Sequence, residues 1–143
     1  MQKIIIDTNV FVSALIQRSY PFYIVDSVFS NNQIQLCISD KLFEEYHEVL
    51  NRDKFSRFPE FLKHALVLLA DIETRANKYF PTIVLEIISD IDDNKLLELA
   101  ETCEADYLIT GNTNDFTLKE YKSTKIVNPR DYWENYLPKS TNT

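Results

Sequence analysis

Glycine is almost absent from this sequence: Gly111 is the only one among 143 residues. Dinucleotide-binding loops and P-loops need several glycines at fixed spacings, because the backbone must approach the phosphate closely. The sequence therefore excludes phosphate binding on a glycine-rich loop.

Sulfur and imidazole ligands are also scarce, with two cysteines and two histidines. Cys37 and Cys103 are far apart in apolar stretches, and neither His47 nor His64 stands at a zinc-ligand spacing. The first residues run into a strand-like segment without the features of a secretory signal. We therefore expect a cytoplasmic protein with reduced, buried thiols and no zinc site.

The sequence also lacks long apolar runs and has fewer basic than acidic residues. No apolar run approaches the roughly 18 residues that a membrane span needs, so we expect no membrane association. Lys and Arg number 15 against 22 Asp and Glu, which gives a net charge of −7. Nucleic-acid binders are usually basic. An acidic chain fits that class if its carboxylates gather around bound cations, and otherwise its partner is not a nucleic acid.

Short β-branched runs alternate with helical periodicity, which indicates an α/β fold with a central, mostly parallel sheet. We expect one domain over residues 1–137 and a disordered polar tail at 138–143. Expected extended segments are 3–6, 33–38, 82–88, 106–110 and 123–127. Expected helices are 10–31 with a break near Pro21, 40–52, 59–79, 93–104 and 129–137.

The first candidate acid is Asp7, which follows the apolar run Ile4–Ile6. It therefore stands at the carboxyl end of the first strand, where open α/β sheets bind ligands. The alternative is that Asp7, Thr8 or Asn9 simply caps the next helix. Both interpretations stay open at this point.

The second candidate, Glu45, follows from helix geometry. Residues on a helix over 40–52 rotate by about 100° each, which gathers the apolar side chains in one stripe. That stripe consists of Leu42, Phe43, Tyr46, Val49 and Leu50. Glu45 falls at its border, from which a carboxylate reaches over the sheet, whereas Glu44 and Glu48 point to solvent. The alternative is a solvated charge.

A third candidate lies in SDIDDNKLLELA, which holds three aspartates within four positions: Asp90, Asp92 and Asp93. Asp93 is placed to cap the following helix. Capping and the helix dipole need only one or two acids, so the excess suggests a cation site. The glutamates outside the apolar face of this helix are expected to be solvated: Glu98, Glu101 and Glu104.

The fourth candidate segment is the turn 110–116, which leaves a predicted buried strand. In a parallel sheet it lies at the same edge as Asp7. Asn112 and Asp115 are the candidates there, although small polar residues also make an ordinary turn. Together the four segments offer oxygen ligands without thiols, the set that hard cations such as Mg²⁺ prefer.

Four stretches together resemble the PIN-domain family, across about residues 3–129, and in particular the toxin components of toxin–antitoxin pairs. They are KIIIDTNVFVSAL, ISDKLFEEYHEVL, SDIDDNKLLELAETCEADYLITGNTNDF and IVNPRDY. The resemblance implies a three-layer α/β/α domain. It also implies a ribonuclease that uses Mg²⁺ or Mn²⁺, with RNA as substrate, a cognate antitoxin as partner and a homodimer as assembly.

The resemblance assigns roles residue by residue. Its catalytic acids match Asp7, Glu45 and Asp93, and Asp115 supplies a further carboxylate. Asn112 stands where the family usually has its fourth acid, so one ligand there is uncharged. Thr8, Asn9 and Thr110 would support the metal ligands or contact phosphate. The alternative to a nuclease is a catalytically weak PIN-like module that binds RNA or protein.

Two groups of basic residues could lead RNA to such a site in spite of the acidic total. The first group is Arg52, Lys54, Arg57 and Lys63, and the second is Lys119, Lys122, Lys125 and Arg130. The acids themselves do not distinguish RNA from DNA.

Overall fold

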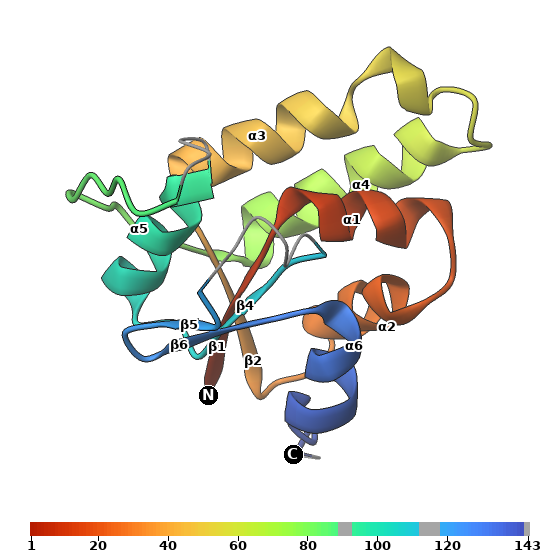
Figure 1. Cartoon of the computed structure of the whole chain (residues 1–143). Helices are drawn as coiled ribbons and strands as arrows, with labels where there is room; N and C mark the ends of the chain where they lie inside the picture. Colours follow the sequence, from red (N-terminus) through yellow and green to blue (C-terminus); the bar gives the residue numbers. More distant parts are fainter. Residues whose placement is uncertain (89–92, 112–117, 142–143) are drawn as a thin grey trace.

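The computed structural model describes residues 1–88, 93–111 and 118–141, which form an α/β fold (Figure 1). The strands are β1 (Gln2–Ile6), β2 (Ile34–Ile38), β3 (Asn77–Lys78), β4 (Tyr107–Ile109), β5 (Glu120–Tyr121) and β6 (Thr124–Val127). They form one sheet in the order β3-β2-β1-β4-β6-β5. Every neighbouring pair is parallel except β5 with β6. The prediction of a mostly parallel α/β sheet is confirmed.

Strand β1 lies inside the sheet between β2 and β4. Its residues Ile4, Ile5 and Ile6 are completely buried. A continuous β-branched run suits such a strand because helices cover both faces of a parallel sheet. The hydrophobic core is therefore built around β1, and its carboxyl end opens directly into the first helix.

The helices are α1 (Thr8–Ile16), α2 (Tyr20–Val28), α3 (Asp40–Leu50), α4 (Phe61–Arg75), α5 (Asn94–Cys103) and the short α6 (Pro129–Asp131). A 3₁₀ turn, η1 (Asp53–Phe55), and a π-helical turn, η3 (Tyr132–Tyr136), complete the described elements. In Figure 1, α1, α3 and α4 gather where the parallel strands end, with α5 on one side of the sheet and α2 and α6 on the other.

Local chemistry explains the helix boundaries. Pro21 lies in the first turn of α2, where its missing N–H costs no hydrogen bond. Ser39 caps α3 by accepting a hydrogen bond from the Leu42 N–H at 3.2 Å. Helix α4 is shorter than expected because the chain after Arg75 leaves the helix to form β3 beside β2.

The extended segment expected at 82–88 has no strand partner, and the strand of this region is the short β3. Side chains of α5 bind its backbone instead. Glu98 accepts a hydrogen bond from the Leu85 N–H at 2.9 Å, and the Asn94 amide oxygen accepts from the N–H groups of Ile87 and Ile88. Glu98 is accordingly buried, so the expectation that it is solvated was wrong.

The end of the described chain returns to the loop that precedes β2. The Asn31 side-chain amide donates to the Pro138 carbonyl at 2.8 Å, and the Asn32 amide donates to the Thr141 carbonyl. The division into a domain over 1–137 and a tail at 138–143 stays a prediction. Within the described ranges, no helix has the length and apolar character to cross a membrane.

Tyr46 anchors α3 to the end of β1. Its hydroxyl donates to the Ile6 carbonyl, and its ring packs edge-on against Phe11 with centroids 4.9 Å apart. Burial, followed by the nearby charges of Asp7 and Glu45, raises the pKa of Tyr46 well above its usual value. The hydroxyl therefore stays protonated and remains a hydrogen-bond donor.

Replacing Tyr46 by Phe tests this anchor. The change keeps the ring but leaves the Ile6 carbonyl without its buried donor, so we expect the free energy of unfolding to fall by about 1–3 kcal/mol. Urea denaturation of Tyr46→Phe and of Tyr23→Phe, an exposed tyrosine, measures the effect. Equal stability of the two variants would contradict the anchoring role.

Candidate active site

Asp7 lies between the end of β1 and the start of α1, and only 7% of it is exposed. Its side chain makes no helix-capping hydrogen bond. Instead, one carboxylate oxygen accepts a hydrogen bond from the Thr110 hydroxyl at 2.8 Å. The two residues meet because β1 and β4 are parallel neighbours and end side by side. The structure therefore does not support the interpretation in which the Asp7 side chain caps α1.

Glu45 reaches the same place from α3. One of its carboxylate oxygens accepts a hydrogen bond from the Thr8 hydroxyl, and the other lies 2.7 Å from the Lys95 ammonium. Its side chain is 25% exposed, whereas Glu44 and Glu48 are exposed on the outer face of α3. Glu45 therefore occupies the border position that the helical stripe predicts. Helices α1, α3 and α5 each contribute a side chain to this cluster.

Lys95 is the member of the cluster that the sequence reasoning missed. It comes from the first turn of α5, and only 15% of its side chain is exposed. A signal existed: it is the only cation in DIDDNKLLELA, and it stands directly before the apolar face of the helix. A lysine at that position places one positive charge against Glu45.

The structure describes only some of the remaining predicted site residues. Asp93 is half-buried at the N-cap position of α5, two residues before Lys95, and its side chain makes no capping hydrogen bond. Asn9 accepts a hydrogen bond from the Gly111 N–H at 3.2 Å, so the chain after β4 is held against the start of α1. Asn112 and Asp115 lie outside the described residues.

The described contacts place two carboxylates, Asp7 and Glu45, close enough to influence each other. In the part of the chain that the structure describes, no three acidic, histidine or cysteine side chains form a group that could hold an ion. A further protein ligand would therefore be Asp93 after a rearrangement, or a residue outside the described ranges. Water can take the remaining positions, because hard cations accept water ligands readily.

Burial is the main reason that the pKa of Asp7 is raised from its usual value, and the charge of Glu45 raises it further. The hydrogen bond from Thr110 and the charge of Lys95 oppose that rise. An ionised Asp7 is thus unfavourable in the metal-free fold, and a bound cation would relieve that cost. The oxygen donors, and the unfavourable burial of Asp7 in particular, fit a hard divalent cation.

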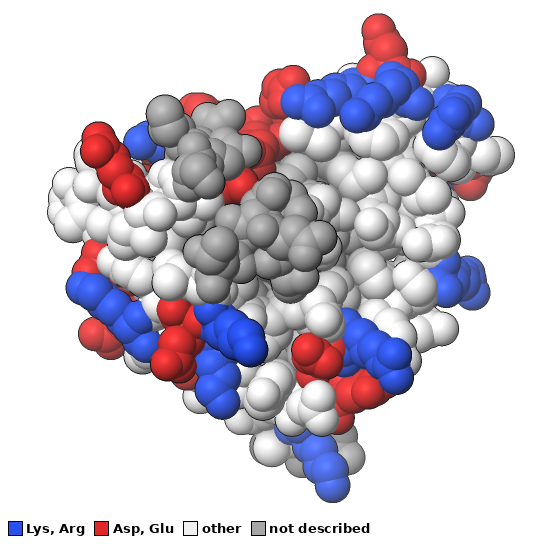
Figure 2. Space-filling model, in the orientation of Figure 1, with Lys and Arg blue, Asp and Glu red and all other residues white. Residues whose placement is uncertain are grey.

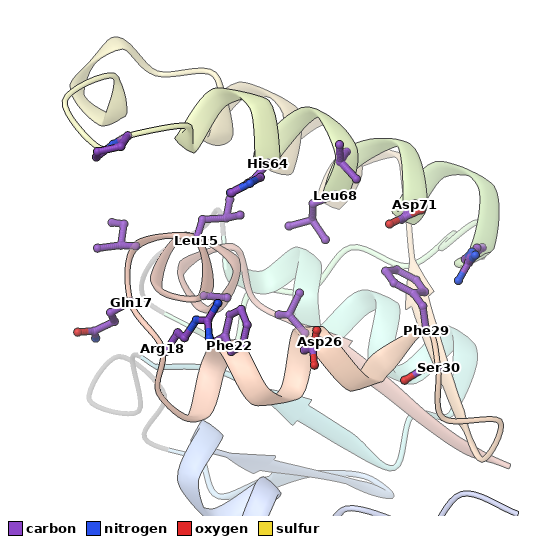
Figure 3. A pocket seen from close by; sticks show the side chains of 16 residues that line it. Leu15, Gln17, Arg18, Phe22, Asp26, Phe29, Ser30, His64, Leu68 and Asp71 are labelled. Atoms are coloured by element: carbon purple, nitrogen blue, oxygen red, sulfur yellow. The ribbon is translucent and has the colours of Figure 1, made fainter.

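A separate cavity of about 690 Å³ lies between α1, α2 and α4 (Figure 3). Apolar side chains such as Leu15, Phe22 and Leu68 line much of it. It begins at the end of α1 opposite Asp7, and none of the candidate acids lines it. The cavity is therefore distinct from the carboxylate cluster.

Acidic and basic side chains are interspersed on the face shown in Figure 2 rather than gathered into one basic field. In the first basic group, Arg52 pairs with Glu48 at 2.8 Å. In the second, Arg130 pairs with Glu134 at 3.1 Å, and Lys122 pairs with Glu101. Several of the expected RNA-guiding cations are therefore already neutralised by neighbouring acids.

Replacing Asp7 by Asn tests the cost of the buried charge. A raised folded-state pKa means that the ionised group destabilises the fold above that pKa, and that this cost disappears as the pH falls below the unfolded-state pKa. Metal-free Asp7→Asn should therefore melt higher than the wild type at pH 7, by about 2–4 °C for each kcal/mol relieved. The difference should shrink towards pH 3.

Thermal denaturation in EDTA between pH 3 and 8 measures this, with Asp26→Asn as an exposed control that should not change the melting temperature. A lower melting temperature for Asp7→Asn at every pH would show that the carboxylate is stabilising in the empty site.

The comparisons with known proteins agree with this architecture. A family model described as PIN domain matches residues 3–114. The uncharacterized protein MJ1680 of Methanocaldococcus jannaschii is 28% identical over 143 aligned positions, covering 94% of this chain and 91% of that protein. PIN domains are in general metal-dependent nucleases, which suits oxygen donors at this sheet edge. The fold and the family match together show that the chain belongs to the PIN-domain family.

Proposed function

We propose that this chain is an endoribonuclease that uses Mg²⁺ or Mn²⁺ to hydrolyse RNA phosphodiester bonds. One observation carries the proposal: the buried Asp7 carboxylate lies beside Glu45 at the carboxyl end of the central strand of a PIN domain. The buried charge of Asp7 is unfavourable in the metal-free fold, and a nuclease that needs a divalent cation gives this acid and its neighbour a use.

Asp7, Glu45 and Asp93 would hold the ion, with Asn112 and Asp115 completing the set. When bound, a divalent ion supplies a Lewis acid for the phosphate and lowers the pKa of a coordinated water. The chain's own part is to orient the donors. The Thr110 hydroxyl fixes one oxygen of Asp7, and the Thr8 hydroxyl fixes one oxygen of Glu45. Such supporting hydrogen bonds hold ligands in a productive orientation.

Lys95 has a second role in this proposal. Its ammonium pairs with Glu45 before any ion binds, and it would attract the negatively charged phosphate of RNA towards the carboxylates. A cation at that position reduces the repulsion between the substrate and an acidic chain. RNA therefore needs no broad basic surface to reach the site.

The alternative is a PIN domain that binds RNA or protein with little or no catalysis. Two features favour it. Asn112 contributes no negative charge where the family has an acid, and the Glu45–Lys95 ion pair satisfies Glu45 without any metal. Cleavage by the purified protein distinguishes the two functions.

The toxin role belongs to the same proposal and rests on the family resemblance. It includes a cognate antitoxin that blocks the acidic site and a homodimer as the working assembly. The chemistry proposed for Asp7 and Glu45 does not depend on either partner.

A cleavage assay with labelled single-stranded RNA tests the proposal, run with Mn²⁺, Mg²⁺ or EDTA and alongside single-stranded DNA of the same sequence. We expect metal-dependent RNA cleavage that falls at least about 100-fold in Asp7→Asn, because even residues that only support metal ligands cost 10–100-fold. Asp26→Asn, an exposed acid on α2 beside the distant cavity, should cleave like the wild type.

Cleavage that persists in Asp7→Asn would contradict the assigned site. Absence of cleavage from a folded wild type that still binds RNA would favour the binding module. Preferential cleavage of DNA would change the substrate class but leave the assigned acids in place.

A further inference from the structure

A second, smaller cavity of about 230 Å³ adjoins the carboxylate cluster. It lies between the first residues of α3, the segment 79–84 and the first turns of α5. Lys95 lines this cavity and is also the ion-pair partner of Glu45. A group bound in the cavity is therefore separated from the proposed reaction centre by one side chain.

The segment beside this cavity is held firmly although it belongs to no strand. At one end, the Tyr79 N–H donates to the Ile38 carbonyl at 2.8 Å. At the other end, the Leu85 N–H donates to Glu98, and Ile88 exchanges hydrogen bonds with the Asn94 side chain. Hydrogen bonds thus hold both ends of the segment that lines one side of the cavity.

Phe80 is the conspicuous side chain of this segment, because it lines the cavity and yet is 70% exposed. Exposure alternates along the segment: Phe80, Thr82 and Val84 are exposed, whereas Pro81 and Ile83 are partly buried. The fold therefore directs the aromatic ring away from the core. Here the ring lies at a cavity beside a proposed nuclease site, where it offers a flat apolar surface to a ligand.

Most of the charged side chains around the cavity have partners within the chain, and among the described residues that line it the exposed Lys41 is the exception. Asp40 pairs with Lys78 at 2.9 Å, Glu98 accepts the Leu85 N–H, and Lys95 pairs with Glu45. A phosphate bound at Lys95 would have to displace Glu45, which leaves only the exposed Lys41 of the described lining to receive it. A flat, uncharged ring with polar edges would not displace an ion pair, and it would find both an aromatic face and polar atoms in the lining.

We propose that this cavity binds an unpaired nucleobase of the RNA substrate, with Phe80 stacked on the base. The proposal rests on the proposed function and names the part of the substrate that is recognised beside the cleaved bond. Proteins that read single-stranded RNA commonly stack its splayed bases on aromatic side chains. Through Lys95, the base in the cavity would determine which phosphodiester lies over Asp7 and Glu45.

The test measures RNA affinity by fluorescence anisotropy in the Asp7→Asn background, which keeps the RNA intact. Stacking on an aromatic side chain is worth about 1–3 kcal/mol per base, so Phe80→Ala should weaken binding of a short single-stranded RNA about 5- to 150-fold. Phe80→Trp should restore the affinity. Ile87→Ala removes an exposed apolar side chain of the same segment outside the cavity and should have no effect.

RNAs that carry one abasic nucleotide at successive positions provide the second readout. One position should lose affinity when its base is removed, and that loss should disappear in Phe80→Ala, because the ring and the base then act as a pair. Thermal melts confirm that each variant is folded.

Unchanged RNA affinity in folded Phe80→Ala would overturn the base cavity while leaving the nuclease proposal standing, because metal-dependent cleavage is measured separately. A Phe80→Ala variant that changes from dimer to monomer at unchanged RNA affinity would identify a second copy of this chain as the occupant, which also overturns the proposal. Failure of every variant and of the wild type to bind RNA would overturn both proposals.

Discussion

The buried carboxylate of Asp7 is the constraint around which the rest of this site is arranged. Burial disfavours its charge and the nearby charge of Glu45 adds to that cost, whereas the Thr110 hydrogen bond and the charge of Lys95 oppose it. Thr110 arrives from the adjacent parallel strand, and Glu45 arrives on a helix that Tyr46 ties to the end of β1. Lys95, which lies on α5, partly offsets the negative charge of both acids. A buried acid whose pKa is raised is typical of functional sites.

Much of this arrangement could be predicted from sequence because it follows from local geometry. A run of three isoleucines before Asp7 predicts a buried strand with an acid at its end, and the helical stripe places Glu45 at a border. Lys95 and Glu98 could not be found this way. Their neighbours, Glu45 and the Leu85 N–H, come from parts of the chain that only the tertiary fold brings close. Segment 82–88 has a strand-like apolar pattern, but side chains of α5 rather than a neighbouring strand accept its backbone hydrogen bonds.

The net charge of −7 is less of an obstacle to a nuclease than it first appears. Acids such as Glu48 and Glu134 are paired with arginines at helix ends, and Asp40 is paired with Lys78. Among the described residues near the candidate site, the positive charge comes from the partly buried Lys95 and, at the adjoining cavity, from the exposed Lys41. If a base cavity beside Lys95 positions the RNA, recognition depends on stacking as well as on phosphate contacts.

In the proposed nuclease, Asp7 and Glu45 form a divalent cation site that Lys95 keeps partly neutralised until the ion binds. Calorimetric titration of metal-free protein with Mn²⁺ measures whether this site exists. The wild type should bind Mn²⁺, Asp7→Asn should bind it at least about 10-fold more weakly, and Lys95→Gln should bind it more tightly because a competing cation is removed. Equal Mn²⁺ affinity in the wild type and Asp7→Asn would contradict the account.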